Sequence, residues 1–413
     1  MTDSRTRRAL AVFVVVLTGL VAGSSALDRV GHLPLAAPAP ADAALALQTN
    51  LAYHSVLAAD LMRSRIRGDE DLARAAEGAV ARNTDAMRDL VGAVLGDQWA
   101  EEFRLLWSAH VTALSNYSSG VEDPGARDAA RAALSTFEGD LAGFLATGSR
   151  GRLSREAARA AAYLHVDHLM RQADAYAARD YARADQLYRE GYAHTFALGE
   201  TIAAALLGPA GAEALREPGW RLRSQLARLL GEHVVLAVAA TRAGVTNAPD
   251  FAAAGEAVNA NTRDLAGAID TLFGAAAAQG FQSLWADHVD QLMAYTGGVA
   301  AGDAGRREAA VNRLKAFERE FAAFLSTATA GRLPATALAG TLLTHDQMLM
   351  AQIDAYAGKQ YEQAHDSAYS TYHHMGEVAG DLALAFSGTL GDRAPAGGSQ
   401  TGYGGTAGHH GPR

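Results

Sequence analysis

Cysteine is absent from the 413-residue chain, which excludes disulfides, thiolate metal sites and a lipid-modified cysteine. Any metal centre must therefore be built from histidine, carboxylate or methionine ligands. Lysine is nearly absent as well, since Lys315 and Lys359 are the only two, and arginine supplies the other basic residues. The net charge is −9, and no basic stripe is interleaved with aromatic residues. We therefore do not expect nucleic acid as a partner.

Several catalytic motifs are also missing from the sequence. It contains a single Glu-x-x-His, at 362–365, where a ferritin-like di-iron site needs two, and it has no His-Glu-x-x-His of zinc proteases. It has no Cys-x-x-Cys-His for covalent haem attachment, no phosphate-binding glycine loop and no dinucleotide fingerprint. These absences argue against an enzyme without excluding one.

The residues that are abundant favour helix. Alanine, leucine, arginine and glutamate dominate the long segments, which lack runs of β-branched residues. No segment shows the alternation of apolar and polar residues that is typical of a strand. The sequence therefore predicts an all-α protein.

The N-terminal segment 1–26 has the pattern of an export signal. Arg5, Arg7 and Arg8 precede an apolar run, and small residues follow it. We expect a secreted or extracytoplasmic protein. The alternative is an uncleaved helix that anchors the chain in the membrane through residues 9–26.

The middle of the chain is an internal repeat, because three stretches recur in order at an offset of 178 to 180 residues. The paired stretches are 104–117 with 283–295, 137–153 with 317–333, and 173–184 with 353–364. The predicted order is signal or anchor (1–26), linker (27–42), repeat one (43–208), linker (209–221), repeat two (222–388) and a disordered glycine-rich tail (389–413).

Turn residues divide each repeat into six helices, and short turns make consecutive helices antiparallel. We therefore expect two tandem antiparallel helical bundles. The predicted turns lie at 68–69, 96–97, 123–125, 148–151 and 178–180 in repeat one, and at 247–250, 274, 301–302, 331–334 and 358–359 in repeat two.

Each predicted helix carries one residue of a regularly spaced series, at intervals of 27 to 29 residues. Two residues equidistant from a hairpin turn lie at the same height, as His54 and Asn83 do about the turn at 68–69. Each series should therefore form a layer across its bundle. The two series are His54, Asn83, His110, Phe137, His165, His194 and His233, Asn261, His288, Phe317, His345, His374.

Four histidines at one height predict a transition-metal or haem site, since imidazole is a common ligand for copper, zinc and iron. The candidate ligands are His54, His110, His165 and His194 in repeat one, and His233, His288, His345 and His374 in repeat two. The candidate supporting residues are Asn83, Asn261, His168, Met348, His373 and Met375. Thioethers beside imidazoles favour copper over zinc or haem. The alternative is a non-catalytic module of the cell envelope, in which the layer only serves packing or a response to pH.

The repeat resembles a group of secreted bacterial tandem helical proteins that are loosely named copper amine oxidases. The matching stretches are ARNTDAM (81–87), FRLLWSAH (103–110), YLHVDHLM (163–170), LARLLGEH (226–233), NANTRDLAGAI (259–269), FQSLWADH (281–288), FLSTATAGRLP (324–334) and YHHM (372–375). The resemblance implies export and the helical unit. It does not imply the oxidase mechanism, because true copper amine oxidases are β-rich and modify a tyrosine in Thr-x-x-Asn-Tyr-Asp/Glu. The nearest string here, 113–118, lacks both the threonine and the acid.

Overall fold

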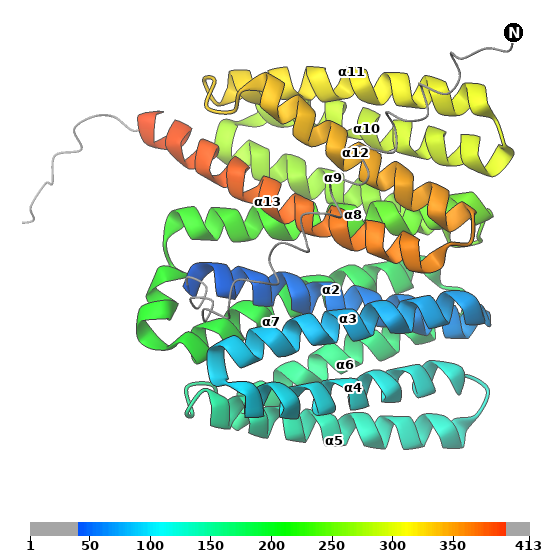
Figure 1. The fold of residues 1–413 in the computed structure, drawn as a ribbon, viewed down its shortest axis with the longest axis vertical. Helices are drawn as coiled ribbons and strands as arrows, with labels where there is room; N and C mark the ends of the chain where they lie inside the picture. The colour runs from blue at the N-terminus through cyan, green and yellow to red at the C-terminus, as the bar shows by residue number, and fades with distance from the viewer. Residues whose placement is uncertain (1–39, 394–413) are drawn as a thin grey trace, which may run out of the picture. The chain divides into compact units, whose positions relative to one another are not determined.

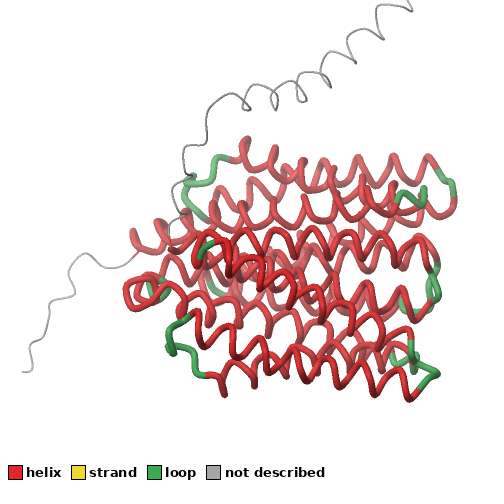
Figure 2. Tube along the Cα trace, turned by 60° about the horizontal axis from the view of Figure 1, so that its bottom comes forward, coloured by secondary structure: helices red, strands yellow, loops and turns green. Residues whose placement is uncertain are grey.

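The computed structural model describes residues 40–393, and every regular element in this range is a helix. The all-α prediction is confirmed, with six helices in each repeat (Figures 1 and 2). Repeat one contains α2 (Pro40–Arg67), α3 (Glu70–Leu95), α4 (Asp97–Ser119), α5 (Pro124–Gly148), α6 (Arg155–Ala177) and α7 (Tyr181–Ala214). Repeat two contains α8 (Pro218–Thr246), α9 (Phe251–Phe273), α10 (Ala275–Ala301), α11 (Ala304–Ala328), α12 (Ala335–Ala357) and α13 (Tyr361–Arg393).

Within each repeat, the helices end near the turns that were predicted from the sequence. Gly96 and Gly274 occupy equivalent turns with φ of 99° and 87°, a backbone conformation that glycine adopts without steric cost. Asp69 and Asp303 begin helices, and each carboxylate accepts a hydrogen bond from a backbone N–H three residues later. These local signals explain why the helix boundaries could be read from the sequence.

The first helix of each repeat is its central helix. In repeat one, α2 packs against α3, α4, α6 and α7, and in repeat two α8 packs against α9, α10, α12 and α13. Close approach of α2 and α7 requires Gly199, because a Cβ there would lie 2.5 Å from the Cα of Gln48. A residue on α2 or α8 can therefore face several neighbouring helices at once.

Helices α7 and α8 are long and apolar enough to cross a membrane by length and composition alone. The most apolar 18-residue window of α8 is 78% buried within the protein. Because α8 is surrounded by other helices, its place in the fold accounts for its apolar composition.

The two repeats pack against each other through equivalent surfaces. Helix α3 contacts α13, and α9 contacts α7, which is the same pairing with the repeats exchanged. Figure 1 shows α3 and α13 on the near side of the molecule. Tyr192 and Tyr372, at equivalent positions, share a hydrogen bond of 3.1 Å in this interface. The contact between repeats is therefore of the kind that relates two subunits of a symmetric dimer.

Some predicted boundaries differ from the observed helices. Helix α2 begins at Pro40, inside the expected linker 27–42, and α13 continues to Arg393, inside the expected tail. The expected linker 209–221 is mostly helical, because α7 bends at Gly208 and resumes at Pro209. The predicted signal or anchor, residues 1–26, lies outside the described residues.

Candidate metal centres

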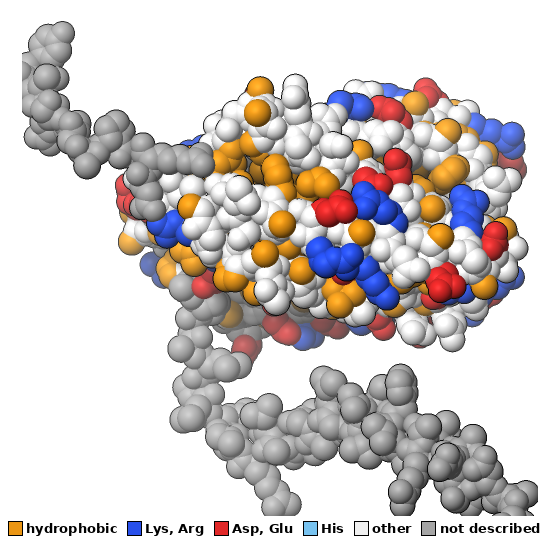
Figure 3. Space-filling model, turned by 90° about the horizontal axis from the view of Figure 1, so that it is seen from above, with side chains coloured by type: hydrophobic (Ala, Val, Ile, Leu, Met, Phe, Trp, Pro, Cys, Tyr) orange, Lys and Arg blue, Asp and Glu red, His pale blue; other side chains and the backbone are white. Residues whose placement is uncertain are grey.

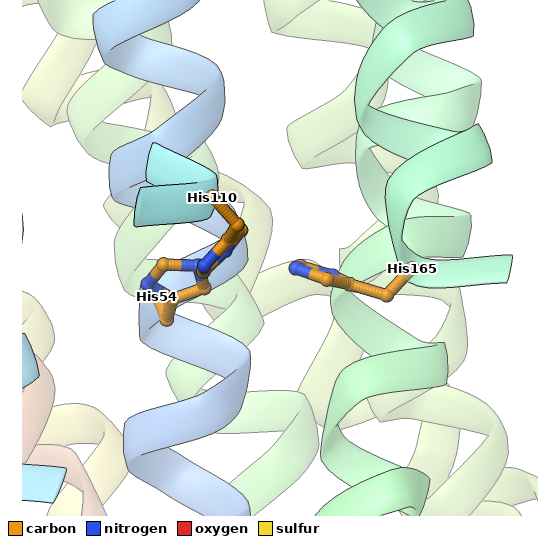
Figure 4. Close-up of side chains that lie close together, drawn as sticks. All are labelled: His54, His110 and His165. Atoms are coloured by element: carbon orange, nitrogen blue, oxygen red, sulfur yellow. The ribbon is translucent and has the colours of Figure 1, made fainter. Parts of the chain in front are cut away.

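Three of the predicted histidines of repeat one meet in the interior of the bundle. His54 on α2, His110 on α4 and His165 on α6 have side-chain nitrogens within 4.8 Å of one another (Figure 4). The residues are only 0%, 1% and 2% exposed. The Nε2 atoms of His54 and His110 lie 3.0 Å apart, and the ring of His165 points toward this pair. Three separate helices thus bring imidazoles to one buried point.

Repeat two builds the same cluster. His233 on α8, His288 on α10 and His345 on α12 also bring nitrogens within 4.8 Å of one another. All three residues are at most 1% exposed. Their ring centroids lie 5.6, 5.9 and 5.7 Å apart, so no ring is displaced from the group.

Burial keeps these imidazoles neutral. Removal from water lowers the pKa of His233 to about 4, and the same desolvation holds the pKa of His54, His110, His165, His288 and His345 well below the ordinary value. Neighbouring histidines lower the pKa of the latter group further. A neutral imidazole carries a nitrogen lone pair, which is the form that coordinates metal.

Aromatic residues enclose each cluster. Phe137 stacks on His110 with ring centroids 4.2 Å apart, and Phe317 stacks on His288 at 4.6 Å. Trp107 and Trp285 lie against His54 and His233 at 4.7 and 4.8 Å. The phenylalanines therefore belong to the predicted layer as its apolar wall.

The two asparagines of the layer form hydrogen bonds to the first helix of their repeat and not to the histidines. The amide of Asn83 donates to the carbonyl of Asn50 at 3.2 Å. Asn261 donates to the carbonyl of Leu229 at 3.1 Å and to the carboxylate of Glu232 at 3.1 Å. Each side chain thus ties the second helix of its repeat to the first.

His194 and His374 are not brought into the clusters. Their Nε2 atoms lie 3.1 and 3.2 Å from the carbonyls of Ala161 and Thr341, one turn before His165 and His345. Both residues lie near the predicted height, but their imidazoles face the backbone of α6 and of α12 and not the cluster. The candidate sites therefore contain three histidines each instead of the four expected.

The supporting residues lie at varied depths. His168 is 9% exposed, with its Nε2 4.0 Å from Glu190 and its ring centroid 5.6 Å from that of His194. His373 packs on Tyr369 with ring centroids 4.2 Å apart. Met348 is half-buried, and Met375 lines a small apolar cavity together with Trp285.

Asp346 is a buried acid that sequence reasoning missed. The residue is 0% exposed, and its Oδ1 lies 3.3 Å from the Nδ1 of His288. Burial, with a smaller contribution from neighbouring Glu318, raises the pKa of Asp346 well above the usual value. Its only sequence signal is a carboxylate next to the layer residue His345, where repeat one has Val166.

A second repeated polar group lies away from the clusters. Tyr117 donates to Asp174 at 3.0 Å, and Arg127 contacts both side chains. The equivalent Tyr295, Asp354 and Arg307 make the same contacts in repeat two, with Tyr295 donating to Asp354 at 2.9 Å. This triad joins three helices near the end of each bundle, so it is a structural tie.

The outer surface carries mixed charge. Figure 3 shows basic and acidic side chains side by side on one face, with hydrophobic side chains between them. Exposed ion pairs of the protein include Arg82–Asp366 and Arg263–Glu256.

No family model matches this chain, and neither a curated protein nor a solved structure is similar enough to count as a match. The function must therefore be argued from the clusters themselves.

Proposed function

We propose that each repeat binds one transition-metal ion, copper in preference to zinc, through its three buried histidines. The observation that carries this proposal is the meeting of three imidazoles, from three helices, in both repeats. Most of their nitrogens have no hydrogen-bond partner among the described residues. Buried polar atoms without partners cost free energy, and a coordinated ion would satisfy them.

The cluster dimensions fit an ion. Metal–nitrogen bonds of about 2.0–2.1 Å hold neighbouring ligand nitrogens roughly 3.3–3.6 Å apart in tetrahedral or trigonal geometry. The observed nitrogens lie within 4.8 Å, with one pair at 3.0 Å. Small side-chain rotations would bring them to these separations.

The chemistry of the ligands supports copper. Imidazole suits both copper and zinc, but at a given nitrogen site Cu²⁺ binds more tightly than Zn²⁺ in the Irving–Williams order. Haem fits less well, because a porphyrin needs open space between its axial ligands. Here the imidazoles lie against one another and against Trp107 and Phe137.

The proposal describes binding rather than catalysis. The six histidines are at most 2% exposed, so no open side remains for a substrate. Export of the protein is part of the proposal and rests on the sequence of residues 1–26. Loading would then accompany folding or a transient separation of the helices, as for other buried metal sites.

A structural histidine layer is the competing function, and one observation favours it. The indole N–H of Trp107 donates to Nδ1 of His54 at 3.2 Å, and Nε2 of His54 meets Nε2 of His110 at 3.0 Å. This chain of hydrogen bonds gives three nitrogens of the repeat-one cluster, two on His54 and one on His110, a partner without any metal. Such a layer would bind no metal.

Metal analysis of the full chain separates the two functions. The protein is refolded with one of Cu²⁺ or Zn²⁺, passed through a desalting column and analysed for bound metal. We expect two copper ions per chain, and one in His110→Ala or His288→Ala. A chain that retains neither copper nor zinc after refolding contradicts the proposal and favours the structural layer.

A further inference from the structure

The two clusters differ in what surrounds their ring nitrogens. In repeat two, the carboxylate of Asp346 lies 3.3 Å from Nδ1 of His288, and both residues are 0% exposed. In repeat one, the equivalent position is Val166, which is also 0% exposed. One cluster therefore has a buried acid next to an imidazole, and the other has an isopropyl group.

In the repeat-one cluster, two of the three imidazoles are joined by a hydrogen bond. An indole nitrogen can only donate, so the Trp107 contact makes Nδ1 of His54 the acceptor. A neutral His54 then carries its hydrogen on Nε2, which donates to Nε2 of His110. The Nε2 atoms of His54 and His110 are thus engaged with each other, and metal binding must first break this chain of hydrogen bonds, whereas neither ring nitrogen of His165 has a partner among the described residues.

The repeat-two cluster has no such chain. Trp285 donates to no partner among the described residues, and neither ring nitrogen of His233 or His345 has one. Nδ1 of His288 and the carboxylate of Asp346 lie 3.3 Å apart without forming a full hydrogen bond. When Asp346 is ionised, this contact favours the hydrogen of His288 on Nδ1, which leaves the Nε2 lone pair free.

Metal-bound histidines usually donate their second ring nitrogen to a carboxylate or carbonyl, which sets the tautomer and the ring orientation. Asp346 places a carboxylate 3.3 Å from Nδ1 of His288, whereas His110 in repeat one meets the backbone carbonyl of Trp107 instead of a carboxylate. We propose that the repeat-two cluster is the tighter metal site and that Asp346 is the residue that positions His288 for binding. This inference rests on the proposed function.

Zinc titration of single-site variants tests the inference, since Zn²⁺ has one oxidation state. His54→Ala leaves only the repeat-two cluster intact, and His233→Ala leaves only the repeat-one cluster. Competition with a chelator should give a zinc affinity at least about 10-fold higher for His54→Ala, by the usual effect of an outer carboxylate. Equal affinities, or tighter binding by His233→Ala, would overturn the inference.

Variants of Asp346 in the His54→Ala background test its positioning role. Asp346→Val, which copies repeat one, should weaken zinc binding by about 10- to 100-fold. Asp346→Asn should keep most of the affinity, because its side-chain carbonyl can still accept from Nδ1. Equal loss in both variants would contradict positioning by this contact. Asp354→Asn, on the same helix but bonded to Tyr295, is the control and should not change the affinity.

Two further readings complete the test. The ¹⁵N shifts of His288 in the metal-free protein should report hydrogen on Nδ1, and Asp346→Val should remove this preference; an unchanged tautomer contradicts the inference. If the unsubstituted chain and both single-site variants bind no zinc or copper, the proposed function fails, and this inference fails with it. Binding by both clusters with equal strength overturns the inference alone.

Discussion

The Nε2 atoms of His54 and His110 lie 3.0 Å apart, although the two residues are 56 positions apart in the chain. Two imidazoles this close share one hydrogen, so the pair cannot be fully protonated without separating. Desolvation of the two residues reinforces this effect, because the charged form has no water around it. Neutral imidazoles are therefore a condition for the native packing.

The metal-free protein should lose stability as the pH falls. Each cluster histidine has a folded-state pKa below its unfolded value, so the unfolded state binds more protons between the two values. The contribution is full above about pH 6.5 and is lost on going down toward pH 4. For His233 alone, the free energy of unfolding should fall by about 2 kcal/mol between pH 7.5 and pH 5. Urea unfolding at these pH values measures it.

The control for this pH dependence is a variant with one fewer titrating group. His233→Gln should show a smaller fall between the same pH values, whatever its stability at pH 7.5. A free energy of unfolding that is level or rises toward pH 5 would contradict the burial of neutral histidines.

Removal of Asp185 should be strongly destabilising. Arg63 is 7% exposed, and it pairs with Asp185 at 2.9 Å while donating to Gln172. Asp185→Ala leaves a buried guanidinium without its counter-charge, which typically costs 3–5 kcal/mol, so we expect a loss of about that size in urea unfolding. Glu101→Ala breaks the exposed Arg104–Glu101 pair and should change stability by less than about 1 kcal/mol. Equal effects of the two substitutions would show that burial of the Arg63 pair does not matter.

Gly231 should not tolerate a side chain. A Cβ at this position would lie 2.6 Å from the hydroxyl of Tyr192 and 2.8 Å from the ring of Tyr372. Gly231→Ala should therefore separate the tyrosine pair between the repeats and cost about 1–3 kcal/mol. Gly267→Ala, on the exposed side of α9 with no atom near the new Cβ, should stabilise by roughly 0.5–1 kcal/mol. Thermal unfolding of both variants gives the comparison, and a stabilised Gly231→Ala would contradict the tight interface.

The helices and their ends could be predicted from the sequence because the turns between them carry local signals. Gly96, Gly274 and the aspartates that begin helices act within a few residues of where they stand, so their effect survives any tertiary arrangement. Counting residues between turns also predicted which side chains share a height. That inference needs only helix geometry and antiparallel order.

The direction of a side chain could not be predicted in the same way. A helix turns by about 100° per residue, so a residue at the right height can face any side. His165 faces the cluster, whereas His194 faces the carbonyl of Ala161. Rotation about the helix axis depends on packing against several neighbours, which spacing does not encode.

The place of Asp346 beside the repeat-two cluster could not be predicted for a different reason. Comparison of the repeats selects residues that both copies share, and Asp346 stands where repeat one has Val166. Its burial next to His288 follows from the packing of α10 and α12. Differences between the copies therefore need the structure to become informative.

X-ray absorption at the copper edge tests the central proposal most directly. The copper-loaded full chain should show about three nitrogen ligands of imidazole type per copper at roughly 2.0 Å, with two coppers per chain. Substitution of His165 and His345 by alanine should abolish both copper sites, whereas substitution of His194 and His374 should leave the spectrum unchanged. A spectrum without imidazole ligands, or one that changes only with His194 and His374, would contradict metal binding at the three-histidine clusters.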